Sequence, residues 1–200
     1  MKRSICILLA LVACLFVQQV LAVQAETAGT LAPIEATAKQ KLALRTGPGT
    51  KYEEIFTLPI SGVRDLHVME QEKGGTVMWA MLDFDSDYGR YRAYTGMKRI
   101  DAKAVPKTQR EGKACRVGKK NVYAYYGPGK DYVRFEEKIP AYTEVTVYHE
   151  EAGYVMADYI MPNAKPQQRD KELLQITRGW IPAEALENYE PVTQTTESDK

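Results

Sequence analysis

Few side chains of this sequence stand at spacings that would support catalysis. Neither histidine, His67 or His149, has a second histidine or a cysteine at metal-ligand spacing. Cys115 and His149 could supply a nucleophile and a base, but no third group that would orient the base is evident. Cys115 also lies in a charged segment rather than at a helix start, where a thiolate would be stabilised. The sequence therefore predicts a protein that is not an enzyme and that holds no cofactor.

One acidic cluster, Asp83-x-Asp85-x-Asp87-x-Gly89, has side chains of a type that suits a metal ion. Alternating aspartates at a loop present oxygen atoms, which hard cations such as Ca²⁺ prefer. However, the glycine stands one position late for a calcium loop, and Tyr94 occupies the place of the distal bidentate glutamate. We keep Asp83, Asp85 and Asp87 as a calcium candidate and take a solvated hairpin end as the default interpretation.

Aromatic side chains offer a different chemistry, the binding of sugars or peptides. Tyrosine is the commonest, with 13 residues against 4 Phe and 2 Trp. Aromatic faces stack on sugar rings or peptide side chains, while their polar ends form hydrogen bonds. The alternative for about half of these rings is the hydrophobic core, since a small domain without disulfides needs them there. The candidates for a shallow ligand groove are Tyr52, Trp79, Tyr91, Tyr94, Tyr126, Tyr132, Tyr154 and Trp180.

The composition is that of a folded, nearly neutral protein. The 200 residues include 27 Lys and Arg against 26 Asp and Glu, and 44% are hydrophobic. This apolar fraction predicts a packed core rather than a disordered tail. Nucleic-acid binding is not expected, because the chain has no positive excess to displace phosphate counterions.

The N-terminus has the features of a signal peptide over residues 1–25. Two basic residues precede an apolar run from Ile5 to Val17, and small residues allow cleavage after Ala25. We expect an exported protein, periplasmic or extracellular, with no membrane span after cleavage. Two alternatives stay open: an uncleaved anchor, or a lipoprotein box, Leu11-Val12-Ala13-Cys14, in which Cys14 is lipidated.

Cleavage after Ala25 would leave a single cysteine. Cys6 and Cys14 lie in the signal segment, so Cys115 would have no partner for an internal disulfide. A passive, half-buried thiol is the expected state, and an intermolecular disulfide is the alternative. The mature protein must therefore be held together by packing.

The rest of the chain contains two copies of one sequence pattern. Residues 44–52, Leu-Arg-Thr-Gly-Pro-Gly-Thr-Lys-Tyr, correspond to residues 124–132, Ala-Tyr-Tyr-Gly-Pro-Gly-Lys-Asp-Tyr, 80 positions later. At an offset of 81, Leu58-Pro59 corresponds to Ile139-Pro140, and 100–105 corresponds to 181–186. Three landmarks in the same order indicate two tandem domains rather than a solenoid repeat.

The sequence pattern of each copy is typical of short β-strands. The expected strands are 63–69, 77–84 and 89–95, then 144–149, 154–160 and 173–181, with a long polar loop over 161–171. Only 182–189 could hold a short helical turn. Short strands in so few residues favour an all-β fold of two small barrels, because a barrel removes exposed strand edges. The expected boundaries are a polar linker 26–38, barrels at 39–106 and 121–189, a basic linker 107–120 and a disordered tail 190–200.

The connector 107–120 carries six basic residues against one acidic residue. A solvated linker is the default interpretation, and a contact with anionic envelope polymer or lipid headgroups is the alternative. Because the connector has no apolar period, we expect few contacts between the copies, so that 36–106 and 117–190 would fold separately.

The run from Leu42 to Tyr52, followed by Leu58-Pro59, resembles the opening of bacterial SH3-like (SH3b) domains. That family opens with an apolar–Arg–x–Gly–Pro–small run, then a Tyr, then Leu-Pro. Trp79 and Gly179-Trp180-Ile181 look like its strand tryptophan and its Gly-Trp-Val element. The resemblance covers roughly residues 39 to 187 as two copies, and it implies two SH3-like β-barrels in tandem.

The copies depart from that pattern at three places. In the second copy, Tyr125 stands in place of the arginine, and Tyr154 stands near the place of Trp79. In the first copy, Gly96-Met97 stands where Gly-Trp is expected.

The two Gly-Pro-Gly runs are interpreted as structural turns. Proline fixes φ, and glycine allows positive φ or a close backbone approach, so that the chain can reverse. The turn residues are Gly47, Pro48, Gly49, Gly127, Pro128 and Gly129.

The resemblance implies a non-catalytic binding protein of the cell envelope, with peptidoglycan or its stem peptides as the ligand. The alternative is an adaptor or inhibitor that binds another envelope polypeptide through the same grooves. No nucleic acid partner is expected in either case.

Overall fold

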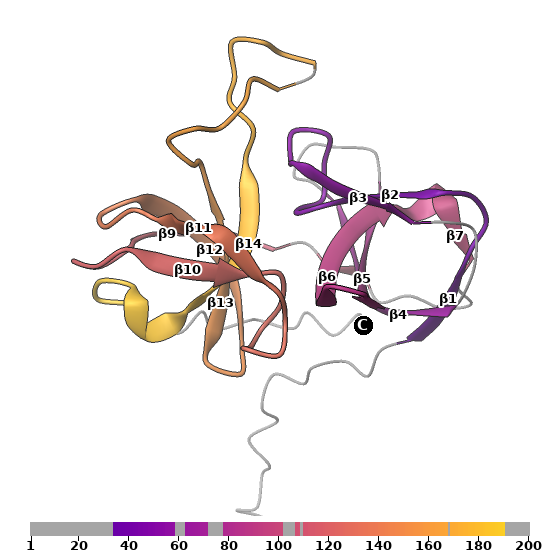
Figure 1. Ribbon diagram of the computed structural model, residues 1–200, viewed down its shortest axis with the longest axis horizontal. Coiled ribbons are helices and arrows are strands. Elements are labelled where there is room, and N and C mark those ends of the chain that lie inside the picture. Colours follow the sequence, from indigo (N-terminus) through magenta and orange to yellow (C-terminus); the bar gives the residue numbers. More distant parts are fainter. Residues whose placement is uncertain are drawn as a thin grey trace, which may run out of the picture. The chain divides into compact units, whose positions relative to one another are not determined.

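The computed structural model of the chain is all-β, as the sequence predicts (Figure 1). The structure describes residues 34–58, 63–71, 78–101, 107–108, 110–167 and 169–190. The expected signal peptide, including Cys14, and the tail after residue 190 lie outside these ranges. No helix within them is long and apolar enough to cross a membrane. Two single 3₁₀ turns are present, Met97–Arg99 and Ala183–Ala185, and the second lies in the segment expected to hold a short helical turn.

The first sheet is formed by the first copy of the repeat. Its strands are β1 (Ile34–Ala38), β2 (Leu42–Arg45), β3 (Glu54–Leu58), β4 (Val63–Gln71), β5 (Met78–Ser86), β6 (Gly89–Gly96), β7 (Ile100–Asp101) and β8 (Lys107–Thr108). They lie in the order β3-β2-β6-β5-β4-β1-β7, and β8 pairs with β4. The β4–β8 pair is parallel, whereas β5 lies antiparallel to both β4 and β6.

The second sheet is formed by the second copy. Its strands are β9 (Lys113–Arg116), β10 (Val122–Tyr125), β11 (Arg134–Ile139), β12 (Glu144–Glu151), β13 (Tyr154–Tyr159) and β14 (Thr177–Pro182). They lie in the order β11-β10-β14-β13-β12-β9, all antiparallel. A long loop lies between β13 and β14, as the sequence predicts for 161–171 (Figure 1). It is longer than expected, because β14 begins at Thr177 rather than at residue 173.

The two sheets repeat one order of strands. The path β3-β2-β6-β5-β4-β1 in the first corresponds to β11-β10-β14-β13-β12-β9 in the second. Met81 pairs with Tyr94 across β5 and β6, as Met156 pairs with Trp180 across β13 and β14. Tyr94 therefore holds the place of Trp180, and the expected correspondence with Gly96-Met97 is wrong. The long β13–β14 loop adds residues to the second copy, so equivalent residues that follow it are separated by a larger number of positions. An alignment that assumes a constant spacing therefore pairs the wrong residues.

Two segments expected to be linkers contain strands. Ile34–Ala38 lies in the expected polar linker, but it forms β1 and pairs with β4. Lys113–Arg116 lies in the expected basic linker, but it forms β9 and pairs with β12. Each sheet is thus extended by a strand from the residues that precede its copy. Backbone pairing outweighs the polar and charged composition of these short strands.

Neither sheet closes into a ring among the described strands. β3 and β7 end the first path, and β11 and β9 end the second. A closed barrel, expected because it removes strand edges, is therefore absent from this part of the chain. The edge strand β11 carries Arg134, Glu136, Glu137 and Lys138. Charged side chains of this kind protect an open edge from pairing with another chain.

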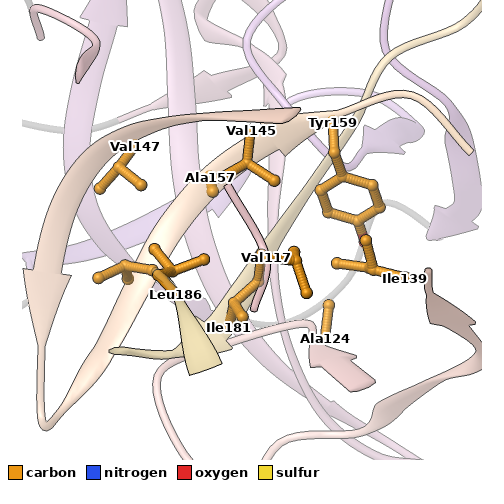
Figure 2. Packing of buried hydrophobic residues seen from close by; sticks show 10 residues of the cluster. Val117, Ala124, Ile139, Val145, Val147, Ala157, Tyr159, Ile181 and Leu186 are labelled. Carbon is orange, nitrogen blue, oxygen red and sulfur yellow. The ribbon is translucent and has the colours of Figure 1, made fainter. Parts of the chain in front are cut away.

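Each sheet has its own hydrophobic core, shown for the second sheet in Figure 2. The first core contains Leu42, Leu44, Ala80, Leu82, Phe84, Tyr91, Ala93 and Ile100. The second contains Val117, Ala124, Ile139, Val145, Val147, Val155, Ala157, Tyr159, Ile181 and Leu186. Along β12, Val145 and Val147 alternate with more exposed residues, which is the period of a half-buried strand.

The two Gly-Pro-Gly runs form tight turns after β2 and β10. In each turn the third residue donates a backbone hydrogen bond to the first, Gly49 to Gly47 and Gly129 to Gly127. The first glycine lies against an aromatic ring of its own loop. A Cβ atom at Gly47 would lie 2.3 Å from the Tyr52 ring, and one at Gly127 would lie 2.1 Å from the Tyr132 ring. Glycine is required here because it lets the ring lie directly on the backbone.

Gly47→Ala and Gly127→Ala are each expected to lower the free energy of unfolding by about 1–3 kcal/mol, since the added methyl group displaces a buried ring. Urea unfolding followed by circular dichroism measures the loss. Gly96→Ala is the matched control, because a Cβ atom there meets nothing within 4 Å. Equal stabilities for Gly47→Ala and Gly96→Ala would contradict this account of the turn.

Candidate functional site

The aromatic residues predicted to line a groove are mostly buried. Tyr126 and Tyr154 are half-buried. The other six candidates are each no more than 9% exposed: Tyr52, Trp79, Tyr91, Tyr94, Tyr132 and Trp180. The shallow groove expected from the sequence is therefore not formed by this set, and its buried members serve as packing.

Tyr52, from the first copy, reaches an aspartate of the second copy. Its hydroxyl donates a 2.6 Å hydrogen bond to Oδ2 of Asp158. Arg178 binds the same carboxylate from β14, with Nε at 2.6 Å from Oδ1. The Arg178 guanidinium also lies 4.5 Å from the ring centroid of Tyr148. Burial raises the pKa of Tyr52, so its hydroxyl stays protonated and can donate.

Tyr132 makes the reciprocal contact with the first copy. Its hydroxyl donates a 2.6 Å hydrogen bond to Oδ2 of Asp83. Arg92 on β6 binds Asp83 with Nε at 2.7 Å from Oδ1 and also binds Glu151 at 2.8 Å. The two tyrosines hold corresponding places in the repeat. We call the two sets, Tyr52–Asp158–Arg178 and Tyr132–Asp83–Arg92, the clasp.

The calcium candidate does not form a metal site. The Asp83 carboxylate is 3% exposed and is bound by Arg90, Arg92 and Tyr132. Asp85 and Asp87 are exposed at the β5–β6 hairpin. Two arginines and a tyrosine hydroxyl, rather than a metal ion, contact the buried Asp83 carboxylate. Among the described residues no group of three His, Cys, Asp or Glu could hold a metal ion.

An apolar cluster fills the space between the two sets of the clasp. It contains Trp79, Met81, Tyr94, Met156 and Trp180, drawn from both copies. The Tyr94 hydroxyl lies 3.4 Å from Sδ of Met156. The expectation of few contacts between the copies is therefore wrong, and both sheets belong to one unit. The polar connector gave no sign of this contact, because the residues that make it lie in the strands and turns.

Cys115 is not placed for nucleophilic chemistry. It lies in β9 opposite Val145 and is a free, partly buried thiol. Burial raises its pKa, which disfavours the reactive thiolate. His149 contacts Glu151 and lies with its ring 5.9 Å from that of Trp180. Lys113 lowers the pKa of the Cys115 thiol, but burial is the larger effect, so the pKa stays raised.

An open cleft of about 310 Å³ lies beneath the β13–β14 loop. Its lining comes from the end of β13, the β13–β14 loop, the start of β14, β11 and Tyr126 just after β10. One further residue, Glu53, comes from the first copy. Its aromatic wall is formed by Tyr126, Phe135 and Tyr159. The Tyr126 and Phe135 rings are stacked, with centroids 3.9 Å apart. Tyr126 also contacts Tyr91 of the first core at 4.8 Å, so the wall continues into that core.

Carboxylates line the outer part of the cleft. Glu53, Glu136 and Glu137 contribute them, and Asn163 of the β13–β14 loop donates to both oxygens of Glu137 at 2.8 and 2.9 Å. Burial raises the pKa of Tyr126, and the nearby Glu53 raises it further. The cleft therefore combines an aromatic wall with a negative field.

Backbone hydrogen bonds between the copies place Glu53. The Glu53 N–H donates to the Ile176 carbonyl at 3.3 Å, and the Ile176 N–H donates to the Lys51 carbonyl at 3.1 Å. Ile176 lies at the end of the β13–β14 loop, between two cleft residues, Gln175 and Thr177. The same contact that joins the copies thus brings a carboxylate of the first copy into the cleft.

Of the residues that line the cleft, only Tyr126 was among those predicted from the sequence to bind a ligand. The prediction missed Glu53, Phe135, Glu136 and Glu137, since charged residues on a short strand usually face solvent. The polar loop with its prolines was recognised, but not its role as a wall of the cleft. Consecutive glutamates opposite such a loop are the signal that could have indicated this site.

No family model and no curated protein matches the sequence. The solved structures that are similar to it include two proteins of Trichomonas vaginalis. NlpC2 from Trichomonas vaginalis is 11% identical with a TM-score of 0.30, over 80% of this chain and 50% of that one. NlpC1 from the same organism is 12% identical with a TM-score of 0.28, over 83% of this chain and 49% of that one. The chain thus spans about half the length of these proteins, and likeness at this level does not establish a shared activity.

Removing Asp158 from the clasp is expected to lower the free energy of unfolding by about 3–5 kcal/mol, because the buried Arg178 loses its ion pair with this carboxylate. Tyr52→Phe and Tyr132→Phe should each lower it by about 1.5–3 kcal/mol, since each loses a hydrogen bond to a carboxylate. Denaturant unfolding of the whole protein measures these losses. Glu54→Ala is the control: it breaks the exposed Arg45–Glu54 pair, worth about 1 kcal/mol or less. An Asp158→Ala loss no larger than this control would contradict the clasp.

His149 should make stability fall on mild acidification. Burial lowers its pKa below the ordinary value near 6.5, so protons bind the unfolded chain first, and stability is lost as pH falls through 6.5. Burial would raise the pKa of Glu151, but hydrogen bonds from His149 and Arg92 lower it to about 2, so its contribution is lost only below about pH 4.5. Unfolding at pH 7 and pH 5 should show a smaller change in His149→Gln than in the parent. The same change in both proteins would show that His149 does not titrate in this way.

Proposed function

We propose that this chain is a non-catalytic, exported binding protein of the cell envelope, built from two SH3-like modules, with peptidoglycan or its peptides as the ligand. The observation that carries the proposal is the open aromatic and acidic cleft beneath the β13–β14 loop. Concave sites with an aromatic wall and a few convergent polar groups are typical of ligand binding. The N-terminal signal-peptide pattern supports export.

Three further observations support this proposal. The described fold is all-β, and its two sheets repeat one strand order. The sequence motifs that resemble SH3b domains occur in both copies in the same order. Two side chains that could have suggested an enzyme instead do not favour one. The pKa of Cys115 is raised, and Asp83 is bound by arginine. A binding protein needs only the cleft, which is present.

An envelope adaptor or inhibitor that binds another polypeptide is the second candidate. One observation favours it: the β13–β14 loop exposes apolar side chains beside the cleft. Leu173 and Leu174 are 53% and 43% exposed, and Ile160 at the other end of the loop is 47% exposed. Exposed apolar residues grouped beside a polar site are typical of protein interfaces.

The mature protein is expected to sediment with insoluble peptidoglycan at low and moderate salt and to release no soluble muropeptides. The cleft supplies the stacking surface for binding. Retention on sacculi is measured by gel, and release is measured by chromatography of the supernatant. Insoluble chitin is the control for non-specific retention by polysaccharide.

Failure of sacculi to retain the protein would favour the adaptor, and Leu173→Ser with Leu174→Ser would then be tested in a search for protein partners. Retention that falls steeply with salt and is lost in Lys119→Gln with Lys120→Gln would assign binding to the basic connector instead, because salt screens exposed charges.

A further inference from the structure

The cleft beneath the β13–β14 loop has carboxylates that the protein does not neutralise. Three glutamates and one lysine, Lys165, line it. Glu137 is held by Asn163. In the part of the chain that the structure describes, Glu53 and Glu136 form no ion pair. Unlike Asp83 and Asp158, which are bound by arginines, these carboxylates are available to a cation that comes from outside.

Tyr159 adds a hydroxyl group close to Tyr126 and Glu53 of the cleft. Tyr159 is 4% exposed and lines the cleft, yet its hydroxyl makes no hydrogen bond with any described residue. Gly179 leaves room for this hydroxyl, because a Cβ atom there would lie 3.0 Å from its oxygen. Burial raises the pKa of Tyr159, so the hydroxyl stays protonated. A hydroxyl group that no described residue hydrogen-bonds can donate to water or to a ligand in the cleft.

The aromatic wall of the cleft offers an apolar surface. The Tyr126 and Phe135 rings stack on one side, and Met161 lies on the loop side. Cationic side chains carry a hydrocarbon stem that packs on apolar surface while the charged head stays at a polar rim. Aromatic faces also attract such cations. The cleft offers both surfaces in the arrangement that such a side chain needs.

We propose that this cleft binds a cationic side chain of a peptide, an ammonium or guanidinium group on an apolar stem. The head lies among Glu53, Glu136 and Glu137, and the stem lies along Tyr126 and Phe135. The inference rests on the binding role proposed above and deepens it, since it names the ligand class of the same cleft. Lys165 competes with the ligand for the same carboxylates.

The site needs both copies. Glu53 comes from the first copy and is placed by the backbone hydrogen bonds with Ile176, whereas the other carboxylates come from β11. Tyr52, the preceding residue, is held in the clasp by Asp158. Loosening the clasp therefore withdraws one of the carboxylates that bind the cation.

The test is an NMR titration of the whole mature protein with the capped peptide acetyl-Ala-Lys-Ala-amide and with its arginine analogue. The norleucine and glutamate analogues are the peptide controls, and 1,5-diaminopentane tests whether a free amine binds instead. Both cationic peptides should shift the amide signals of Glu136, Glu137 and Gln175, and the norleucine and glutamate peptides should not.

Variants that remove a negative charge from the cleft and a variant that removes a positive charge should change the affinity in opposite directions. A purely structural role of these residues would not produce this pattern. Glu53→Gln and Glu136→Gln should each weaken binding of the lysine peptide by about two- to fivefold, whereas Lys165→Gln should tighten it by a similar factor. The matched controls, Glu144→Gln and Lys171→Gln, change exposed charges that do not line the cleft and should leave affinity unchanged.

Three results would overturn the inference: equal binding of the norleucine and lysine peptides, binding of diaminopentane alone, or weaker binding in Lys165→Gln. Sacculi retention of the same variants separates the two proposals. If the cationic peptides bind but sacculi retain nothing, the cleft inference stands and the peptidoglycan role falls. If sacculi retain the parent and Glu53→Gln with Glu136→Gln equally, and no peptide binds, the cleft inference falls and the peptidoglycan role stands.

Discussion

Two buried carboxylates constrain how the copies of the repeat fit together. Asp83 and Asp158 are 3% and 9% exposed, and a carboxylate so far from water is strongly destabilising unless it is paired and hydrogen-bonded. Each aspartate receives an arginine from its own sheet, but the tyrosine that donates to it comes from the other copy. Each copy pairs the charge of its own aspartate, but one hydrogen bond to each carboxylate comes from the other copy, so the stability of each copy depends on the other.

The Gly-Pro-Gly turns follow from this constraint. For Tyr52 and Tyr132 to reach across the contact, their rings lie back over the turns that precede them, against Gly47 and Gly127. Any larger residue at these glycines would push the ring away from the aspartate. The turn motif, which resembles the opening of a known domain family, is thus tied to the contact between copies, and the apolar cluster around Met81 and Met156 fills the space between the two sets of the clasp.

The sequence predicted the elements better than it predicted their contacts. The alternation of apolar and polar residues along segments such as β12 made the strands predictable. The landmarks that recur in the same order made the two copies predictable. The short strands β1 and β9 were missed because their polar composition resembles that of a linker. Tyr52 and Tyr132 were recognised as equivalent and suspected of shared packing, but their partners lie 106 and 49 residues away. A single sequence carries no periodic signal for pairs at such distances. The cleft was missed for the same reason, since Glu53 joins it only when the copies meet.

The clasp and the cleft share one short segment of the chain, which contains Tyr52 and Glu53. Tyr52 extends into the contact between the copies, and Glu53, the next residue, lines the cleft. The residues on either side of Tyr52 hold this segment against Ile176, through backbone hydrogen bonds of the Lys51 carbonyl and the Glu53 N–H. Successive residues of an extended segment point to opposite sides, so one short stretch serves both purposes. An occupant of the cleft that contacts Glu53 must therefore bind the joined copies better than the separated ones. By mass action it stabilises the joined state in proportion to its affinity. The strength of the clasp and the affinity of the cleft are consequently linked, and a change that weakens one weakens the other.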